Sequence, residues 1–144
     1  MINGVKMITE NNNFKFHHIG LAVHEPKKGI NFLLLLGYNV GNEIFDNTQN
    51  VFLRYCTHTS MPPVELIYGD ENGFPLKSIL SKKDDTIYHL CFEIQSIDNL
   101  NSLFSALGVK AKRISNKTYS ILFKTNIIFY YIPGMGLTEF VEGI

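Results

Sequence analysis

The sequence contains the same strand-like pattern twice. FHHIGLAV at 16–23 returns as IYHLCFEI at 87–94, and in each copy a histidine precedes an apolar stretch with a small or polar residue at every second place. The interval between the two histidines, His18 and His89, equals the interval between two later glycines, Gly37 and Gly108. We call it the repeat interval, because self-similarity at a fixed period indicates an internal duplication. A chain of 144 residues is long enough for one domain built from two such copies.

Both copies continue with the same order of elements. Gly37 and Gly108 each end a segment with helical spacing. The first copy predicts a strand at 18–23, a helix at 25–37, and strands at 39–45, 50–56 and 63–69. The second copy predicts a strand at 87–94, a helix at 96–108 capped by Ser96 or Asp98, an extra short strand at 118–124, and strands at 109–115, 126–133 and 136–143.

These patterns predict the α+β class, with a single domain at 14–143 that consists of two βαβββ modules, 14–69 and 86–143. We expect each module to form a curved mixed sheet, mostly antiparallel, with a helix on its convex side, and we expect a metal-binding cavity between or inside the two modules. The connector at 70–85 contains a short amphipathic piece at 74–82. Residues 1–13 are polar, and we expect them to form a frayed N-terminal extension.

The alternation along the two histidine strands separates two faces. Side chains alternate between the faces of a strand, so His18 shares a face with Gly20 and Ala22, and His89 shares one with Cys91 and Glu93. The opposite face of each strand is apolar, as expected where a helix covers the sheet. The face with histidine and small residues therefore resembles the wall of a cavity.

Two glutamates occupy matched strands near the end of each copy. Glu65 in VELIY corresponds to Glu139 in LTEFV, at an offset slightly longer than the repeat interval, as a short loop insertion would give. A lone carboxylate in such an apolar strand is costly to bury. An approximate two-fold axis between the copies would bring two imidazoles and two carboxylates together, which is the ligand set of a divalent metal such as zinc. We therefore predict a metal site from His18, Glu65, His89 and Glu139.

Other titratable residues lack this matching. His17, His24 and His58 have no counterparts in the other copy, and Glu142 lies on the opposite strand face from Glu139. We expect all four at the surface. The matched positions are what distinguish the four predicted ligands from ordinary strand histidines and glutamates.

Composition narrows the class of protein. Apolar residues make up 45% of the chain, and 13 basic side chains balance 13 acidic ones, so we expect no nucleic-acid or membrane partner. The longest aliphatic run, 32–36, is far shorter than the roughly 20 residues of a membrane-spanning helix. Cys56 and Cys91 each lie in an apolar strand and are expected to be reduced thiols. Cytoplasmic localisation is the prediction.

Paired modules that carry HHIGLAV, VELI, YHLCFEI and LTEFVEG resemble the vicinal oxygen chelate superfamily. This superfamily includes glyoxalase I, methylmalonyl-CoA epimerase, extradiol dioxygenases, and fosfomycin and bleomycin resistance proteins. The resemblance covers 14–143 and is most specific to the epimerase and glyoxalase branch. It implies that His18, Glu65, His89 and Glu139 occupy the four ligand positions of a divalent ion: cobalt, nickel, manganese or zinc.

Some positions depart from the patterns of this branch. Epimerases commonly have glutamine where this chain has Glu65, which is the residue found in glyoxalase I. Some epimerases carry a further carboxylate on the preceding strand, but 50–56 contains none. The closing segment YIPGMGLTEF lacks the lysine-containing turn often seen in the acyl-CoA enzymes. Arg54 and Arg113 are the only arginines available to hold a glutathione adduct.

The resemblance implies a metal-dependent isomerase or lyase that removes a proton next to a carbonyl. The small-molecule substrate would be a thioester or a hemithioacetal, as for methylmalonyl-CoA epimerase or lactoylglutathione lyase. Glu139 and Glu65, one from each copy, are the predicted catalytic bases. Because two small modules leave strand edges that need cover, we also expect a homodimer.

Two other functions fit parts of the pattern. His18, His89 and Glu139 alone would form the two-histidine, one-carboxylate triad of an Fe(II) dioxygenase, although Glu65 would occupy a position that oxygen needs. A non-catalytic binding protein of the bleomycin-resistance type is the other alternative. Such binders commonly lack the metal ligands, so the presence of all four favours an enzyme.

Overall fold

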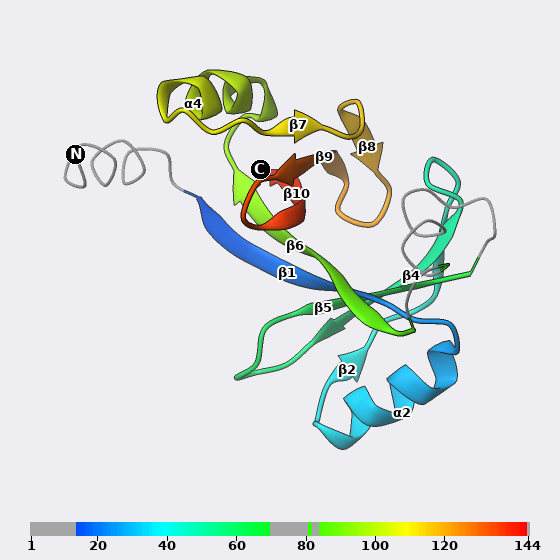
Figure 1. Ribbon diagram of the computed structural model, residues 1–144. Coiled ribbons are helices and arrows are strands. Elements are labelled where there is room, and N and C mark those ends of the chain that lie inside the picture. The colour runs from blue at the N-terminus through cyan, green and yellow to red at the C-terminus, as the bar shows by residue number, and fades with distance from the viewer. Residues whose placement is uncertain (1–13, 70–80, 82–83, 144) are drawn as a thin grey trace. The chain divides into compact units, whose positions relative to one another are not determined.

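The protein was analysed as a computed structural model that describes residues 14–69, 81 and 84–143 (Figure 1). The predicted N-terminal extension at 1–13 and the amphipathic piece at 74–82, apart from Ser81, lie outside the described residues. The chain divides into two compact units, His18–Leu90 and the pair of segments Met1–His17 and Cys91–Ile144. We call them the first-half unit and the second-half unit. The division falls inside two strands, so each of these strands contributes residues to both units.

The first-half unit begins within strand β1 (Lys15–Ala22) and ends within strand β6 (Thr86–Ile94). Between them lie α2 (Pro26–Leu35), β2 (Asn39–Val40), β3 (Ile44–Asp46), β4 (Val51–Thr57) and β5 (Val64–Tyr68). The strand order is β2-β4-β5-β1-β6, with β3 also pairing with β4. β1 and β5 are parallel, whereas β4 is antiparallel to β2, β3 and β5. The first and last strands of the first copy are therefore direct neighbours.

Helix α2 covers one face of this sheet. Pro26 stands at its start, where its fixed φ suits the first turn and its missing N–H is not needed. Leu33 is the buried residue of the helix and packs with a cluster that includes Val23, Cys56 and Leu66. Deleting a buried leucine side chain from such a core typically costs about 2–5 kcal/mol of stability. Leu33 therefore fixes α2 on the sheet.

The second-half unit continues from β6 into η1 (Ile97–Asn99) and α4 (Leu100–Ala106). Four strands follow: β7 (Lys112–Arg113), β8 (Thr118–Ser120), β9 (Thr125–Ile132) and β10 (Gly136–Glu142). The order is β6-β10-β9-β7, with β8 pairing with β9, and β9 is antiparallel to β7, β8 and β10. Leu100, fully buried at the start of α4, packs with Ile94, Ile128 and Phe140. The core of this unit thus lies between α4 and the sheet.

Both helices end in the same hydrogen-bonded motif. The Tyr38 N–H donates to the Leu33 carbonyl and Gly37 N–H to the Leu34 carbonyl, each over 3.0 Å, with φ of +95° at Gly37. The second helix repeats this arrangement around Gly108, whose φ is +68°. These are Schellman caps, in which a left-handed residue satisfies the last helical carbonyls. The two glycines that revealed the repeat are therefore the helix terminators the sequence predicted.

The predicted α+β class, the mixed sheet and the strand-helix-strand order are confirmed, with local differences. The single strand expected at 39–45 is split into β2 and β3, and the strand expected at 109–115 shrinks to β7. The short strand expected at 118–124 is present as β8. Ser96 is the N-cap of η1, but its side chain makes no capping hydrogen bond. In the described part of the chain, no helix is long and apolar enough to cross a bilayer.

Candidate metal centre

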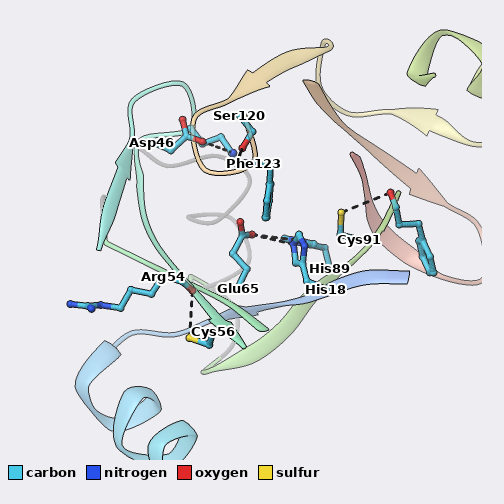
Figure 2. Close-up of polar contacts among 11 residues, drawn as sticks. His18, Asp46, Arg54, Cys56, Glu65, His89, Cys91, Ser120 and Phe123 are labelled. Carbon is cyan, nitrogen blue, oxygen red and sulfur yellow. Dashed lines mark hydrogen bonds and ion pairs between the residues drawn. The ribbon is translucent and has the colours of Figure 1, made fainter. Parts of the chain in front are cut away.

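His18 and His89 come together inside the first-half unit. Their Nε2 atoms are 3.2 Å apart, their rings cross at 77°, and the two residues are 0% and 2% exposed (Figure 2). The Tyr55 ring lies edge-on to His18 and the Tyr88 ring edge-on to His89, with centroids 5.9 and 4.5 Å away. Aromatic packing of this kind fixes ring orientation. Both imidazoles therefore present Nε2 to one point.

The small residue after His18 has a definite structural role. A Cβ built on Gly20 would lie against Cε1 of His89 and 2.6 Å from its Nε2. This is closer than any real contact allows, so the His89 ring occupies the space that a side chain at Gly20 would need. Glycine at this place in β1 is thus required by the histidine of β6.

Glu65 brings a carboxylate to the same point. It lies beside Gly20 in the parallel β1–β5 register and is 4% exposed. Its Oε1 is 3.5 Å from Nε2 of His18 and 3.6 Å from Nε2 of His89 (Figure 2). The first-half unit therefore gathers three of the four predicted ligands: two nitrogens and one oxygen.

The spacing of these three atoms fits a shared metal ion. Ligands about 2.1 Å from a tetrahedral ion lie about 3.4 Å from one another, and the three separations here are 3.2, 3.5 and 3.6 Å. Two imidazoles and a carboxylate are also ligand types that zinc and neighbouring transition metals accept. Taking a carboxylate out of water is costly unless a positive charge compensates it. A divalent cation would provide that charge.

Glu139 belongs to the second-half unit. It lies in β10 opposite Phe129 of β9, and it is 2% exposed. Along β10 its neighbours Thr138 and Phe140 point to the other face of the strand. Glu139 is thus buried in its strand, and its place as the fourth ligand stays a prediction.

The residues expected at the surface behave differently from one another. His24 is exposed, but His17 and His58 are only half-exposed. His58 Nε2 lies 3.0 Å from the Leu36 carbonyl at the end of α2, and its Nδ1 accepts the Ser60 N–H over 3.0 Å. His58 therefore secures the end of a helix, which a search for repeated residues could not show.

The expectation that Glu142 is solvated is wrong. Its Oε2 accepts the Ile97 N–H over 2.9 Å, and its Oε1 accepts Asn126 Nδ2–H over 3.0 Å. Glu142 thus provides the acceptor for the start of η1 that Ser96 was predicted to provide. The strand position of Glu142 gave no signal for this, because Ile97 is distant in the sequence.

Other polar groups near the centre have structural tasks. Arg54 donates from Nη1 to the Gly41 carbonyl over 3.0 Å and from Nε to the Tyr68 hydroxyl over 3.1 Å, and that hydroxyl donates to Glu43. Burial, followed by the hydrogen bond to Glu43, raises the pKa of Tyr68. This network ties β4 to β5 and to the β2–β3 segment. Arg54 is therefore engaged within the protein.

Asp46 is another buried carboxylate that the sequence did not single out. It accepts the Thr48 N–H over 2.9 Å, the Thr48 hydroxyl over 2.6 Å and the Gln49 side-chain amide over 2.9 Å. These bonds close the turn between β3 and β4, an arrangement typical of aspartate at turns. Asp46 is accordingly a turn residue.

A protein-family model matches most of this chain. The model described as Glyoxalase/Bleomycin resistance protein/Dioxygenase superfamily matches residues 17–123, well over half of the 144 residues. The chain therefore belongs to this superfamily, as its resemblance to the vicinal oxygen chelate proteins predicted. His18, Glu65 and His89 lie inside the matched span, and Glu139 lies beyond it. A comparison with curated proteins finds no match.

Solved structures share the fold at low identity. A methylmalonyl-CoA epimerase from Mycobacterium tuberculosis has a TM-score of 0.73 at 20% identity, covering 90% of this chain and 87% of that one. A hypothetical protein from Bacillus halodurans C-125 has a TM-score of 0.78 at 20% identity, covering 92% and 96%. A methylmalonyl-CoA epimerase in complex with methylmalonyl-CoA has a TM-score of 0.68 at 20% identity, covering 90% and 94%. The fold is thus the one these proteins have.

Proposed function

We propose that this chain is a metal-dependent isomerase that removes a proton next to a carbonyl of a small acyl thioester. The observation that carries the proposal is the convergence of His18 Nε2, His89 Nε2 and Glu65 Oε1 at separations of 3.2, 3.5 and 3.6 Å. Similarity in fold to methylmalonyl-CoA epimerases, one of them bound to methylmalonyl-CoA, supports the thioester class. A lactoylglutathione lyase activity on a hemithioacetal is the related reaction that the test below separates.

The ion would be held by His18, His89 and Glu65, with Glu139 proposed as the fourth ligand. Cobalt, nickel, manganese or zinc fits two imidazoles with carboxylates. When bound, such an ion supplies Lewis-acid stabilisation of the negative charge that develops on a carbonyl oxygen, typically several kcal/mol.

Proton transfer is assigned to the glutamates. A base must reach the α-proton within hydrogen-bond distance, and its carboxylate must be ionised before the transfer. Glu139 is our first candidate and Glu65 the second. Tyr55 and Tyr88 keep the two imidazole rings in place, and Gly20 leaves the room that His89 needs. These residues position the ligands and do not take part in the proton transfer.

Glu65 also bears on the alternative oxygenase. Its Oε1 lies within 3.6 Å of both histidine nitrogens, where a three-ligand Fe(II) centre would leave a position open. His18, His89 and Glu65 are by themselves two histidines and one carboxylate, so the isomerase site differs from such a centre by the proposed fourth ligand, Glu139. The proposal also includes a homodimer and a cytoplasmic location. Sedimentation at micromolar concentration tests for the homodimer.

Metal analysis and α-proton exchange test the proposal together. The purified protein should bind about one cobalt(II) or zinc per chain, and His89→Ala should lose it. Wild-type protein loaded with metal should exchange the α-proton of methylmalonyl-CoA with deuterium from solvent. Glu139→Gln should retain metal but lower this exchange by about 10² to 10⁴, the usual contribution of a general base. A parallel assay uses the hemithioacetal of methylglyoxal and glutathione.

The outcomes separate the candidates. Near-normal exchange by Glu139→Gln, with loss in Glu65→Gln, would transfer the base to Glu65. Bound iron would favour the oxygenase, and conversion of the hemithioacetal alone would favour the lyase. Protein that binds no metal and exchanges neither substrate would be a binding protein of the drug-resistance type, and the proposal would be wrong.

A further inference from the structure

A cavity of about 460 Å³ lies in the second-half unit on the side covered by α4. Its wall consists of side chains from β6, α4 and the β9–β10 hairpin, among them Phe92, Leu103, Phe104, Leu107, Ile132 and Phe140. Small-molecule sites in proteins typically enclose about 300–1,000 Å³, and a dry apolar cavity of about 150 Å³ already holds benzene. The space under α4 is therefore large enough for a molecule of several rings or a medium alkyl chain.

The lining is almost entirely apolar. Thr138 is the one residue among the lining set with a polar side chain, and its hydroxyl donates to the Gly136 carbonyl over 3.2 Å. Among the described residues, no charged or amide side chain lines the cavity. A ligand with a buried charge would therefore find no counter-charge among the lining residues, and burying it would be costly. The chemistry selects an uncharged apolar occupant.

The cavity is open to solvent, and its wall is formed by packed side chains. Phe14 and Met135 line it and remain 38% and 58% exposed, so they mark an opening to solvent. Methionine is flexible and suits an adaptable entrance. The Phe104 ring packs against Tyr130 and Phe140 with centroids 5.2 and 6.0 Å away. The wall is thus held by contacts inside the unit and does not need a ligand to form.

The cavity is also separate from the predicted base. Thr138 and Phe140 line it, and Glu139 between them points to the opposite face of β10. A molecule in the cavity would therefore lie on the other side of the strand from the Glu139 carboxylate. The cavity is a second place on this chain where a ligand fits.

We propose that the cavity under α4 is a binding site for an uncharged apolar molecule, an aromatic ring system or an alkyl chain. The volume, the apolar lining and the methionine at its entrance carry the assignment. Burying apolar surface provides the affinity. The ligand is recognised by shape and apolar character, and the site is independent of the metal centre.

A neutral fluorescent probe, N-phenyl-1-naphthylamine, tests the site. The full chain should bind it saturably with one site per chain. Leu107→Trp should weaken binding by about tenfold or more, because the indole fills part of a close-packed volume. Leu36→Trp is the matched control, since Leu36 ends α2 at the corresponding position of the first copy and is 37% exposed. Its affinity for the probe should equal that of the wild type.

A second pair of variants tests the site in case Leu107→Trp fails to fold. Met135→Glu places a charge at the exposed entrance and should also weaken probe binding, with the melting temperature unchanged because the site of substitution is exposed. Met61→Glu is its control, at 38% exposure in the first-half unit. Absence of saturable binding to wild-type protein, or equal effects within each pair, would overturn the proposal.

Competition distinguishes the sources of the apolar group. Displacement of the probe by butylbenzene supports a free apolar molecule, and displacement by lysophosphatidylcholine below its micelle concentration supports the alkyl chain of a lipid. Displacement by neither would overturn the assignment.

Probe binding should not change when EDTA removes metal, and loss of binding under EDTA would place the probe at the metal centre and contradict the proposal. Failure of any of these tests leaves the exchange assay of the proposed isomerase unaffected.

Discussion

The two halves of the chain use the same strand and helix order but pack their helices differently. A Cβ on Gly29 of α2 would lie 3.3 Å from Cδ1 of Leu66, so α2 lies close to β5. At the corresponding position of the second copy, α4 has Leu100, whose whole side chain is buried between helix and sheet. Leu33 of α2 is 5% exposed, whereas its counterpart Phe104 stays half-buried. The second copy thus has a larger residue at the start of its helix and looser packing between that helix and the sheet.

This difference shows which parts of a duplicated fold can diverge. The helix ends keep the same glycine caps, and the histidine strands keep the same residue at the same place. The contact between helix and sheet has glycine in the first copy and leucine in the second, and a cavity lies in the half with leucine. Helix packing distance depends on the side chains at the contact. A single position can therefore change what one face of a module offers to a ligand.

Truncation at this contact should have the largest effect on stability. Leu100→Ala removes a fully buried side chain and should lower the free energy of unfolding by about 2–5 kcal/mol. Gly29→Ala should change it by less than about 1 kcal/mol, because the gain in helix propensity offsets a contact that Leu66 can relieve by moving. Urea unfolding of both variants measures the difference. Equal losses would show that the two helices pack alike.

The matched positions after the histidines provide the next test. Gly20 and Cys91 correspond in the repeat, yet only Gly20 has the His89 ring over it. Gly20→Ala should displace that ring, costing about 1–3 kcal/mol of stability and weakening metal binding about 10–100-fold. Cys91→Ala should keep metal affinity. Cobalt(II) titration followed by its visible absorption measures both, and retained cobalt affinity in Gly20→Ala would contradict the role assigned to glycine.

The repeat made much of the fold and most of the centre predictable. Apolar periodicity located the helices, and matched glycines located their ends. His18, His89 and Glu65 were predicted because a residue type that is unusual in apolar strands occurred at repeated positions. All three meet in the first-half unit. The reason for Gly20 could not be found this way, because it depends on a ring that comes from another strand.

Tertiary contacts decided what the sequence left open. The strand expected at 109–115 is short because the regular ladder with β9 is limited to Lys112 and Arg113, after which the N–H groups of Ile114 and Ser115 both donate to the Phe129 carbonyl. Glu142 was expected in water but accepts hydrogen bonds from Ile97 and Asn126, both distant in the chain. Local alternation assigns a residue to a strand face but does not identify its partner. Distant partners and cavity volumes therefore required coordinates.

The two helix caps should differ moderately. Gly37 has φ of +95°, and a Cβ there would lie 3.1 Å from His58 Nε2, whereas Gly108 has φ of +68° and open space around it. Gly37→Ala should cost about 1–2 kcal/mol, the usual cost of left-handed backbone for a residue with a Cβ. Gly108→Ala should cost less, since it meets no additional contact. Thermal unfolding of the two variants compares them, and a larger loss for Gly108→Ala would reverse the ranking.

The smallest expected effect is a difference in alkaline stability between the halves. Cys56 in β4 and Tyr130 in β9 occupy corresponding positions, at the same offset as Glu65 and Glu139. Burial raises the pKa of the Cys56 thiol above its ordinary 9.0, although the Gly41 backbone and Arg54 oppose the rise. Burial likewise raises the pKa of Tyr130 above its ordinary 10.0, with Arg113 opposing it. Both groups thus hold their protons more tightly in the folded protein.

The sign of the effect follows from this difference in proton binding. Below its ordinary pKa each group is protonated in both the folded and the unfolded chain, so the full stability is present. Above that pKa the group ionises first in the unfolded chain, which favours unfolding. Stability then falls until the group in the folded protein also ionises. The fall should begin near pH 9 for Cys56 and near pH 10 for Tyr130. One proton limits each slope to about 1.4 kcal/mol per pH unit. Urea unfolding between pH 8 and 11 measures the loss of stability. Cys56→Ala should remove the earlier part of that loss, and Tyr130→Phe should remove the later part. A loss that neither substitution alters would have to come from other groups.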